Sequence, residues 1–164
     1  STNCNAGRCR PLWKRMIKYN LQVEPSLLAV LLPYLAKVYR ETSGSKDGQR
    51  FAPPESGDEE LDDAWIEGLV DEGRADRLSF SRLLERPALE FGRVEIPEDE
   101  AEEALRGMTE LRLFLRERGL KSVTDEDLEN GRIEIPKLTP EARTAYLGYL
   151  LLAEMQERLI AEIS

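Results

Sequence analysis

Apolar and polar residues alternate in some short segments of this chain, and apolar residues recur at helical spacing in the longer ones. Residues 16–23 carry apolar side chains at every second position, which is typical of a half-buried strand. In residues 25–41 the apolar positions repeat every three or four residues, and Pro25 suits the first turn of a helix. Pro33 lies inside this run and has no N–H to donate, so we expect a kink or a break there.

A six-residue segment occurs twice in the second half of the chain. GRVEIP at residues 92–97 returns as GRIEIP at residues 131–136, and a helical pattern follows each copy. Apolar and charged residues alternate in both copies, which predicts two short strands with one buried face each. Pairing of the copies would bring opposite charges together across the ladder. We therefore predict that they pair with each other, with residues 16–23 as a candidate third strand.

The last helical segment is apolar on nearly every face between residues 145 and 153, which predicts a helix at the centre of a bundle. Thr139 is its expected N-cap, and Pro140 fits its first turn. Gly107 and Gly148 occupy equivalent places in the two repeats. Glycine weakens a helix but permits close approach of a neighbour, so we predict that both are packing positions.

The composition of the chain changes in its middle part. Residues at about 42–60 are rich in Gly, Ser, Pro and charge, which predicts a mobile loop. Residues 59–89 again show helical spacing, and Gly73 is a candidate boundary between two helices. A chain of 164 residues suits one domain. The predicted fold is mainly α (α+β): a helical bundle with a small two- or three-stranded antiparallel sheet over residues 16–164, preceded by a flexible basic tail over residues 1–15.

Arg112 is a charged residue within the apolar stripe of its predicted helix. Arginine keeps its proton in proteins, so a buried Arg112 requires a carboxylate or several carbonyl groups around its donors. The candidate acids are Glu154 or Glu157 in the last helix and Glu67 or Asp71 in residues 59–89. Exposed backbone carbonyls at a helix end are further candidates, and Gln156 is a neutral alternative. We interpret Arg112, Gln156 and Glu157 as a structural buried-charge cluster. An anion-binding role of Arg112 is the alternative.

The chain contains no histidine, which excludes Ser-His-Asp and Cys-His nucleophiles and the usual zinc-hydrolase ligand sets within it. Cys4 and Cys9 alone make a poor zinc site, and we interpret them as incidental thiols of the tail. Paired acids in residues 58–63 or 98–103 are the candidates for a carboxylate- or metal-dependent enzyme, which would need a cleft. Acids in such runs usually face water. We predict no catalytic residues, no metal and no cofactor.

The net charge of −9 is unevenly distributed, because residues 1–23 carry five Lys or Arg and no acid. The acidic body disfavours nucleic-acid binding, although contact with RNA or DNA through the basic tail is an alternative. Candidate partner-binding residues are Arg8, Arg10, Trp13, Lys14 and Arg15. No apolar run reaches the roughly 20 residues of a membrane span, and no secretory signal is visible. We expect a cytoplasmic protein-interaction or regulatory module without catalysis, and the C-terminal helix is the candidate surface for homodimerisation.

Two helical segments resemble motifs of a known family. EDEAEEALRGMTELRLFLRERGL, at residues 98–120, and YLLLAEMQERLI, at residues 149–160, are similar to the bacterial domain-of-unknown-function family number two thousand and seventeen. The first motif would be filled by Thr109, Glu110, Leu111, Arg112 and Leu113, and the second by Leu152, Met155, Gln156 and Glu157. Thr109 and Glu110 replace an Asn and an Asp of the family's pattern, and Leu151 replaces a Trp. The resemblance implies no enzymatic activity, because the family is uncharacterised.

Overall fold

The computed structural model describes residues 2–5, 8–11, 15–43 and 77–164, and the side chains of residues 15–42 and 77–164. Most of the predicted loop at about residues 42–60 lies outside this range, although residues 42 and 43 still belong to a helix. The predicted helical segment over residues 59–89 is described only from residue 77, so Gly73 also lies outside.

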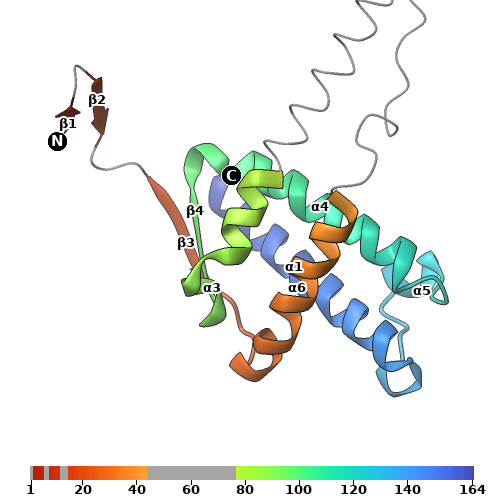
Figure 1. The fold of residues 1–164 in the computed structure, drawn as a ribbon. Coiled ribbons are helices and arrows are strands. Elements are labelled where there is room, and N and C mark those ends of the chain that lie inside the picture. Colours follow the sequence, from red (N-terminus) through yellow and green to blue (C-terminus); the bar gives the residue numbers. More distant parts are fainter. Residues whose placement is uncertain (1, 6–7, 12–14, 44–76) are drawn as a thin grey trace, which may run out of the picture.

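Three long helices form the body of the described part of the chain: α1 (Pro25–Ser43), α4 (Ala101–Arg118) and α6 (Pro140–Ile163) (Figure 1). The other helical elements of the described part are residues 77–85, α3 (Pro87–Glu90), η2 (Glu98–Glu100), α5 (Asp125–Glu129) and η3 (Ile135–Lys137). Strands β3 (Met16–Asn20) and β4 (Arg93–Pro97) form one antiparallel pair, and β1 (Thr2–Asn5) and β2 (Arg8–Pro11) form another. The fold is mainly α with a small antiparallel sheet, as the sequence predicted.

α6 lies against α4, α1 and β3, which together cover most of its apolar residues. Thr139 caps its N-terminus, because the Thr139 hydroxyl accepts a hydrogen bond of 3.2 Å from the backbone N–H of Ala142. Pro140 lies in the first turn, where a backbone N–H has no acceptor within the helix, so the missing N–H of proline costs no hydrogen bond. The predictions of the cap and of a central position for this helix are confirmed.

α1 continues through Pro33 without a break. Pro33 is exposed, so its ring faces away from the buried side of the helix, where Leu28, Leu31 and Leu35 are almost completely inaccessible. These buried leucines hold both halves of the helix on the same core, and their burial offsets the one hydrogen bond that proline removes. The predicted break does not occur.

The sheet pairing differs from the prediction. β4 pairs with β3, so Ile17 lies opposite Ile96 on the buried face and Lys18 lies opposite Glu95 on the outer face. The second copy of the repeat, residues 131–136, is not a strand and ends in η3. α4 has 18 residues, and a helix of that length spans about 27 Å, so it carries the chain to the end far from β4 (Figure 1). The predicted pairing of the two copies is therefore wrong, and the candidate third strand is the true partner.

Both predicted packing glycines lie at close contacts between elements. A Cβ atom at Gly107 would lie 2.6 Å from Cβ of Phe80, and one at Gly148 would lie 2.9 Å from Cδ2 of Leu35. Both distances are shorter than any ordinary contact between carbon atoms. Gly107 therefore admits the helix over residues 77–85 to α4, and Gly148 admits α1 to α6, which confirms the prediction.

Two strands pair within the N-terminal segment that the sequence predicts to be a flexible tail. β1 and β2 are antiparallel, and Cys4 lies opposite Cys9 in their register. This pair is a separate sheet from β3 and β4.

Tyr19 fastens the sheet to α6. Its hydroxyl group donates a buried hydrogen bond of 2.7 Å to the backbone oxygen of Met155, and the Arg158 guanidinium carbon lies 5.3 Å from its ring centroid. Burial raises the pKa of Tyr19 well above its ordinary value of 10.0, although the nearby Arg158 partly opposes this shift. The folded protein therefore retains a neutral phenol under conditions that ionise the same group in the unfolded chain.

This raised pKa predicts a loss of stability at alkaline pH. Above about pH 10 the unfolded chain releases the Tyr19 proton and the folded chain retains it, so the free energy of unfolding falls as pH rises. Between about pH 9 and about pH 11 the wild type should lose about 1 kcal/mol more than Tyr19→Phe. Urea unfolding of both proteins across this range measures the difference, and two parallel pH profiles would contradict the prediction.

Candidate functional site

Arg112 lies between α4 and α6 and contacts two side chains of α6. Its Nη1 donates a hydrogen bond of 2.7 Å to Oε1 of Gln156, and its Nη2 donates one of 2.9 Å to the hydroxyl oxygen of Tyr149. The guanidinium carbon also lies 4.6 Å from the ring centroid of Tyr149. The half-buried cation therefore rests against an aromatic face and bonds two neutral oxygen atoms.

Gln156 is held in one orientation by three hydrogen bonds. Its Nε2 donates to the hydroxyl group of Thr109 at 2.7 Å and to the backbone oxygen of Leu105 at 3.1 Å. Thr109 in turn donates to the same backbone oxygen at 3.1 Å. Because both amide hydrogens are used in this way, Oε1 of Gln156 faces Arg112. Arg112, Tyr149, Gln156 and Thr109 thus form one polar cluster, and the two segments that carry the family resemblance meet there.

The acids that the sequence offered to Arg112 lie elsewhere or outside the described residues. Glu157 is exposed and is not a buried charge. The negative charge of Glu154 contributes to the raised pKa of Tyr19. Among the residues that the structure describes, no carboxylate forms an ion pair with Arg112; Glu67 and Asp71 are not among them. The neutral alternative, Gln156, is the partner. Tyr149 was not predicted, although it lies seven residues before Gln156 and hence on the same helical face.

The acidic residues 98–103 do not converge on one point. Glu98 forms an ion pair of 3.6 Å with Arg15, Glu100 pairs with Arg82 at 3.0 Å, and Glu103 accepts a hydrogen bond of 2.5 Å from Ser79. Within residues 15–42 and 77–164, no group of acids or cysteines is arranged to hold a metal ion. The acids of residues 58–63 lie outside the described part of the chain.

Arg15 is the candidate partner-binding residue whose side chain the structure describes. It is exposed and pairs with the exposed Glu98. A solvent-exposed ion pair of this kind is weak and easily exchanged. The side chains of the other candidates, Arg8, Arg10, Trp13 and Lys14, lie outside the described residues.

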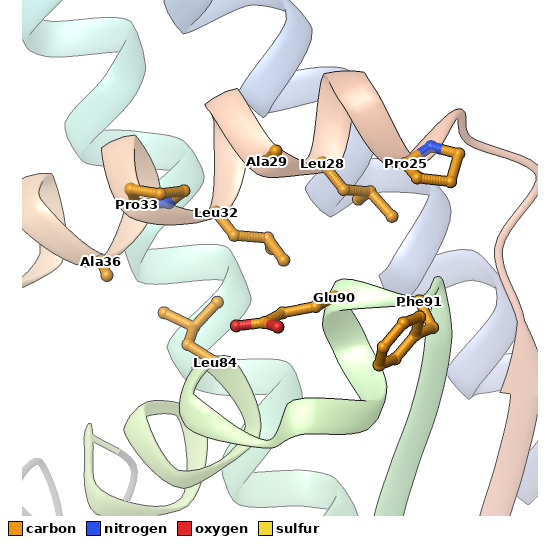
Figure 2. A pocket seen from close by; sticks show the side chains of 9 residues that line it. All are labelled: Pro25, Leu28, Ala29, Leu32, Pro33, Ala36, Leu84, Glu90 and Phe91. Atoms are coloured by element: carbon orange, nitrogen blue, oxygen red, sulfur yellow. The ribbon is translucent and has the colours of Figure 1, made fainter.

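An apolar groove of about 560 Å³ runs along the exposed side of α1 (Figure 2). It is lined by α1, by the end of the helix over residues 77–85, and by α3 with the residue that follows it. The lining residues are Pro25, Leu28, Ala29, Leu32, Pro33, Ala36, Leu84, Glu90 and Phe91. The sequence analysis did not predict this groove.

Gly92 explains why Phe91 stands at the rim of the groove. Gly92 has a φ of +81°, which L residues rarely adopt, and its backbone reverses the chain from α3 into β4. Its N–H donates to the Leu89 oxygen at 2.9 Å, and its own oxygen accepts from the Leu21 N–H at 2.7 Å. The turn leaves the Phe91 side chain 81% exposed, the highest value among the exposed large hydrophobic residues of the described part.

Glu90 is the charged residue in the groove lining. Figure 2 shows its carboxylate between the side chains of Leu32 and Leu84. Glu90 is exposed, so its carboxylate stays accessible to a cation at the edge of the apolar surface. The groove therefore combines an apolar surface with a single negative point.

The predicted homodimer through α6 stays a prediction. Leu150, Ile160 and Ile163 of this helix remain 43%, 49% and 41% exposed. Within the described residues, no helix has both the length and the apolar character of a membrane span.

Comparison with known proteins identifies a family. No curated protein and no solved structure matches the chain. The family model described as Domain of unknown function (DUF2017) matches residues 26–163, which include α4, α6 and all of α1 except its first residue, and therefore both the polar cluster and most of the groove. The family that the two helical motifs predicted is confirmed: the chain belongs to the DUF2017 family.

Proposed function

We propose that the protein is a small cytoplasmic protein-interaction module whose groove beside α1 binds one amphipathic helix of a partner protein. The observation that carries this proposal is the exposed Phe91 ring at the rim of an apolar groove. Exposed aromatic residues beside apolar clefts are characteristic of interaction sites, because their burial on binding removes a large apolar area from water.

The shape of the groove supports a helix as the occupant. The α1 residues that line it run from Pro25 to Ala36, which corresponds to about 16 Å along a helix axis. A docked helix usually presents apolar residues at positions i, i+3 or i+4, and i+7, which span roughly 10 Å. Two turns of such a helix therefore fit beside α1, with Phe91 as the aromatic contact at one side.

The charge of the groove supports a basic residue on that helix. The stem of a Lys or Arg side chain can lie on Leu32 and Leu84 while its cationic end reaches Glu90. The net charge of −9 favours the approach of a basic partner over an acidic one. The proposed partner segment is therefore amphipathic and cationic.

A peptide selection tests the proposal. Helical peptides of about 16 residues, selected from a random display library against the full chain, should share apolar residues at the spacing above together with a Lys or Arg. Ala29→Arg should weaken their binding about tenfold or more, because Ala29 is exposed in the groove and a long cationic side chain obstructs it. Phe91→Ala should weaken binding to a similar degree.

Val30→Arg is the matched control. Val30 is the next residue of the same helix, is 58% exposed and does not line the groove. The same new side chain should leave binding unchanged there. Peptides that bind Ala29→Arg as tightly as the wild type, or that show no common cationic residue, would contradict the proposed site.

A further inference from the structure

Arg112 and Tyr149 have hydrogen-bond donors that the described residues do not use. Of the five N–H groups of a guanidinium, one at Nη1 and one at Nη2 donate to Gln156 and Tyr149, and the buried Nε has no acceptor in the described structure. The Tyr149 hydroxyl accepts from Arg112, and its own hydrogen has no acceptor among the described residues. Donors of this kind on a half-buried cation are uncommon, because folding deprives them of water.

The charge of this cluster is also incompletely balanced. The described partners of Arg112 are neutral, and a half-buried cation normally lies beside an anion. Arg116 follows one turn later on the same face of α4 and forms an ion pair with Asp125. That hydrogen bond raises the pKa of Arg116, and the nearby Tyr149 phenol adds to the shift, which places Arg116 close to the Tyr149 hydroxyl. Arg112 therefore bonds the Tyr149 hydroxyl directly, and Arg116, which is paired with Asp125, lies near it.

We propose that Arg112 and Tyr149 bind an oxyanion, the carboxylate or phosphate group of a ligand, with Arg116 supplying further positive charge. The oxyanion accepts one hydrogen bond from the Tyr149 O–H and one or two from the remaining Arg112 N–H groups. Guanidinium groups match carboxylate and phosphate oxygens in spacing, and charge-assisted hydrogen bonds of this type are strong.

The site is already held in its binding geometry. Gln156 fixes one edge of the guanidinium and is itself held by Thr109 and by the Leu105 oxygen. The Tyr149 ring supports the guanidinium from its face. Little side-chain freedom is lost when an anion binds such an arginine, which favours binding. The site lies between α4 and α6, so it is separate from the groove beside α1 and does not depend on the function proposed for that groove.

Titration of the full chain with inorganic phosphate and with acetate at low ionic strength tests the site. Backbone NMR signals of residues around Arg112 should shift and saturate, with a dissociation constant on the order of 1 mM. Tyr149→Phe keeps the aromatic ring and removes the hydroxyl group, and it should weaken binding about tenfold. Arg112→Gln should abolish it. Tighter binding of phosphate identifies a phosphorylated ligand, and equal or tighter binding of acetate identifies a carboxylate.

Two matched controls separate this site from general attraction to basic residues. Tyr146→Phe makes the same change in the same helix, and Arg132→Gln removes an exposed arginine elsewhere. Both should bind the anions as the wild type does. The proposal is overturned if neither anion gives saturable shifts, or if Tyr149→Phe binds as tightly as the wild type. It is also overturned if only a Glu67→Gln, Asp71→Asn double variant binds, because an acid of the chain itself would then occupy the site.

Discussion

Phe80→Ala is expected to lower the free energy of unfolding by about 3–5 kcal/mol. Phe80 is fully buried, and its ring meets the Tyr39 ring edge to face, with centroids 5.1 Å apart and an interplanar angle of 81°. Its Cβ also fills the space that Gly107 leaves on α4. Truncation keeps this Cβ but removes the ring, which contacts Tyr39 on α1 and lies beside Gly107 on α4, and the rigid surroundings cannot close the cavity.

This loss is a large part of the stability of a typical domain, which is about 5–15 kcal/mol. Urea unfolding followed by circular dichroism measures it. Leu78→Ala is the matched control, because Leu78 lies in the same helix and is 55% exposed, and the expected change there is below about 1 kcal/mol. Equal losses for the two variants would show that Phe80 is not the residue that holds this helix in place.

Gln156→Leu is expected to lower the free energy of unfolding by about 2–3 kcal/mol. The substitution preserves most of the side-chain volume but removes the oxygen that accepts from Arg112 at 2.7 Å. It also leaves the Thr109 hydroxyl without the hydrogen bond that Gln156 donates. The half-buried guanidinium then retains Tyr149 as its remaining acceptor among the described residues.

A double-mutant cycle with Arg112→Met isolates the contact between the two side chains. The double variant should be more stable than the sum of the single losses predicts, by about 0.5–3 kcal/mol, because it leaves neither a cation nor an amide without a partner. Gln22→Leu, at an exposed position, serves as the control for the same substitution. Strict additivity of the two single losses would mean that Arg112 and Gln156 do not stabilise each other.

The repeat shows how far the sequence determines this fold. Both copies alternate apolar and charged residues, and that pattern correctly predicted β4 at residues 93–97. The same pattern failed at residues 131–136, because a strand also needs a neighbour to bond with, and α4 places the second copy far from the first. Alternation describes which residues face a core. It does not say where the partner strand lies.

The polar cluster was predictable in part. The position of Arg112 in an apolar stripe showed that the residue needed partners. The sequence offered both acids and an amide on α6 as candidates and did not decide between them. The rotation of α6 about its axis decides between them, and it turns Gln156 and Tyr149 toward Arg112 while Glu157 remains in solvent. The groove could not be foreseen from the sequence, since it depends on the angle between α3 and β4, which the turn at Gly92 sets.

Pro33 has a consequence for whatever lies in the groove. Because proline has no N–H, the carbonyl oxygen of Ala29 receives no hydrogen bond from the residue four positions later, and both residues line the groove. The part of α1 beside the groove thus contains a backbone carbonyl group that lacks its usual helical donor. A hydrogen bond from a bound peptide to this carbonyl group would fix the register of the peptide along α1.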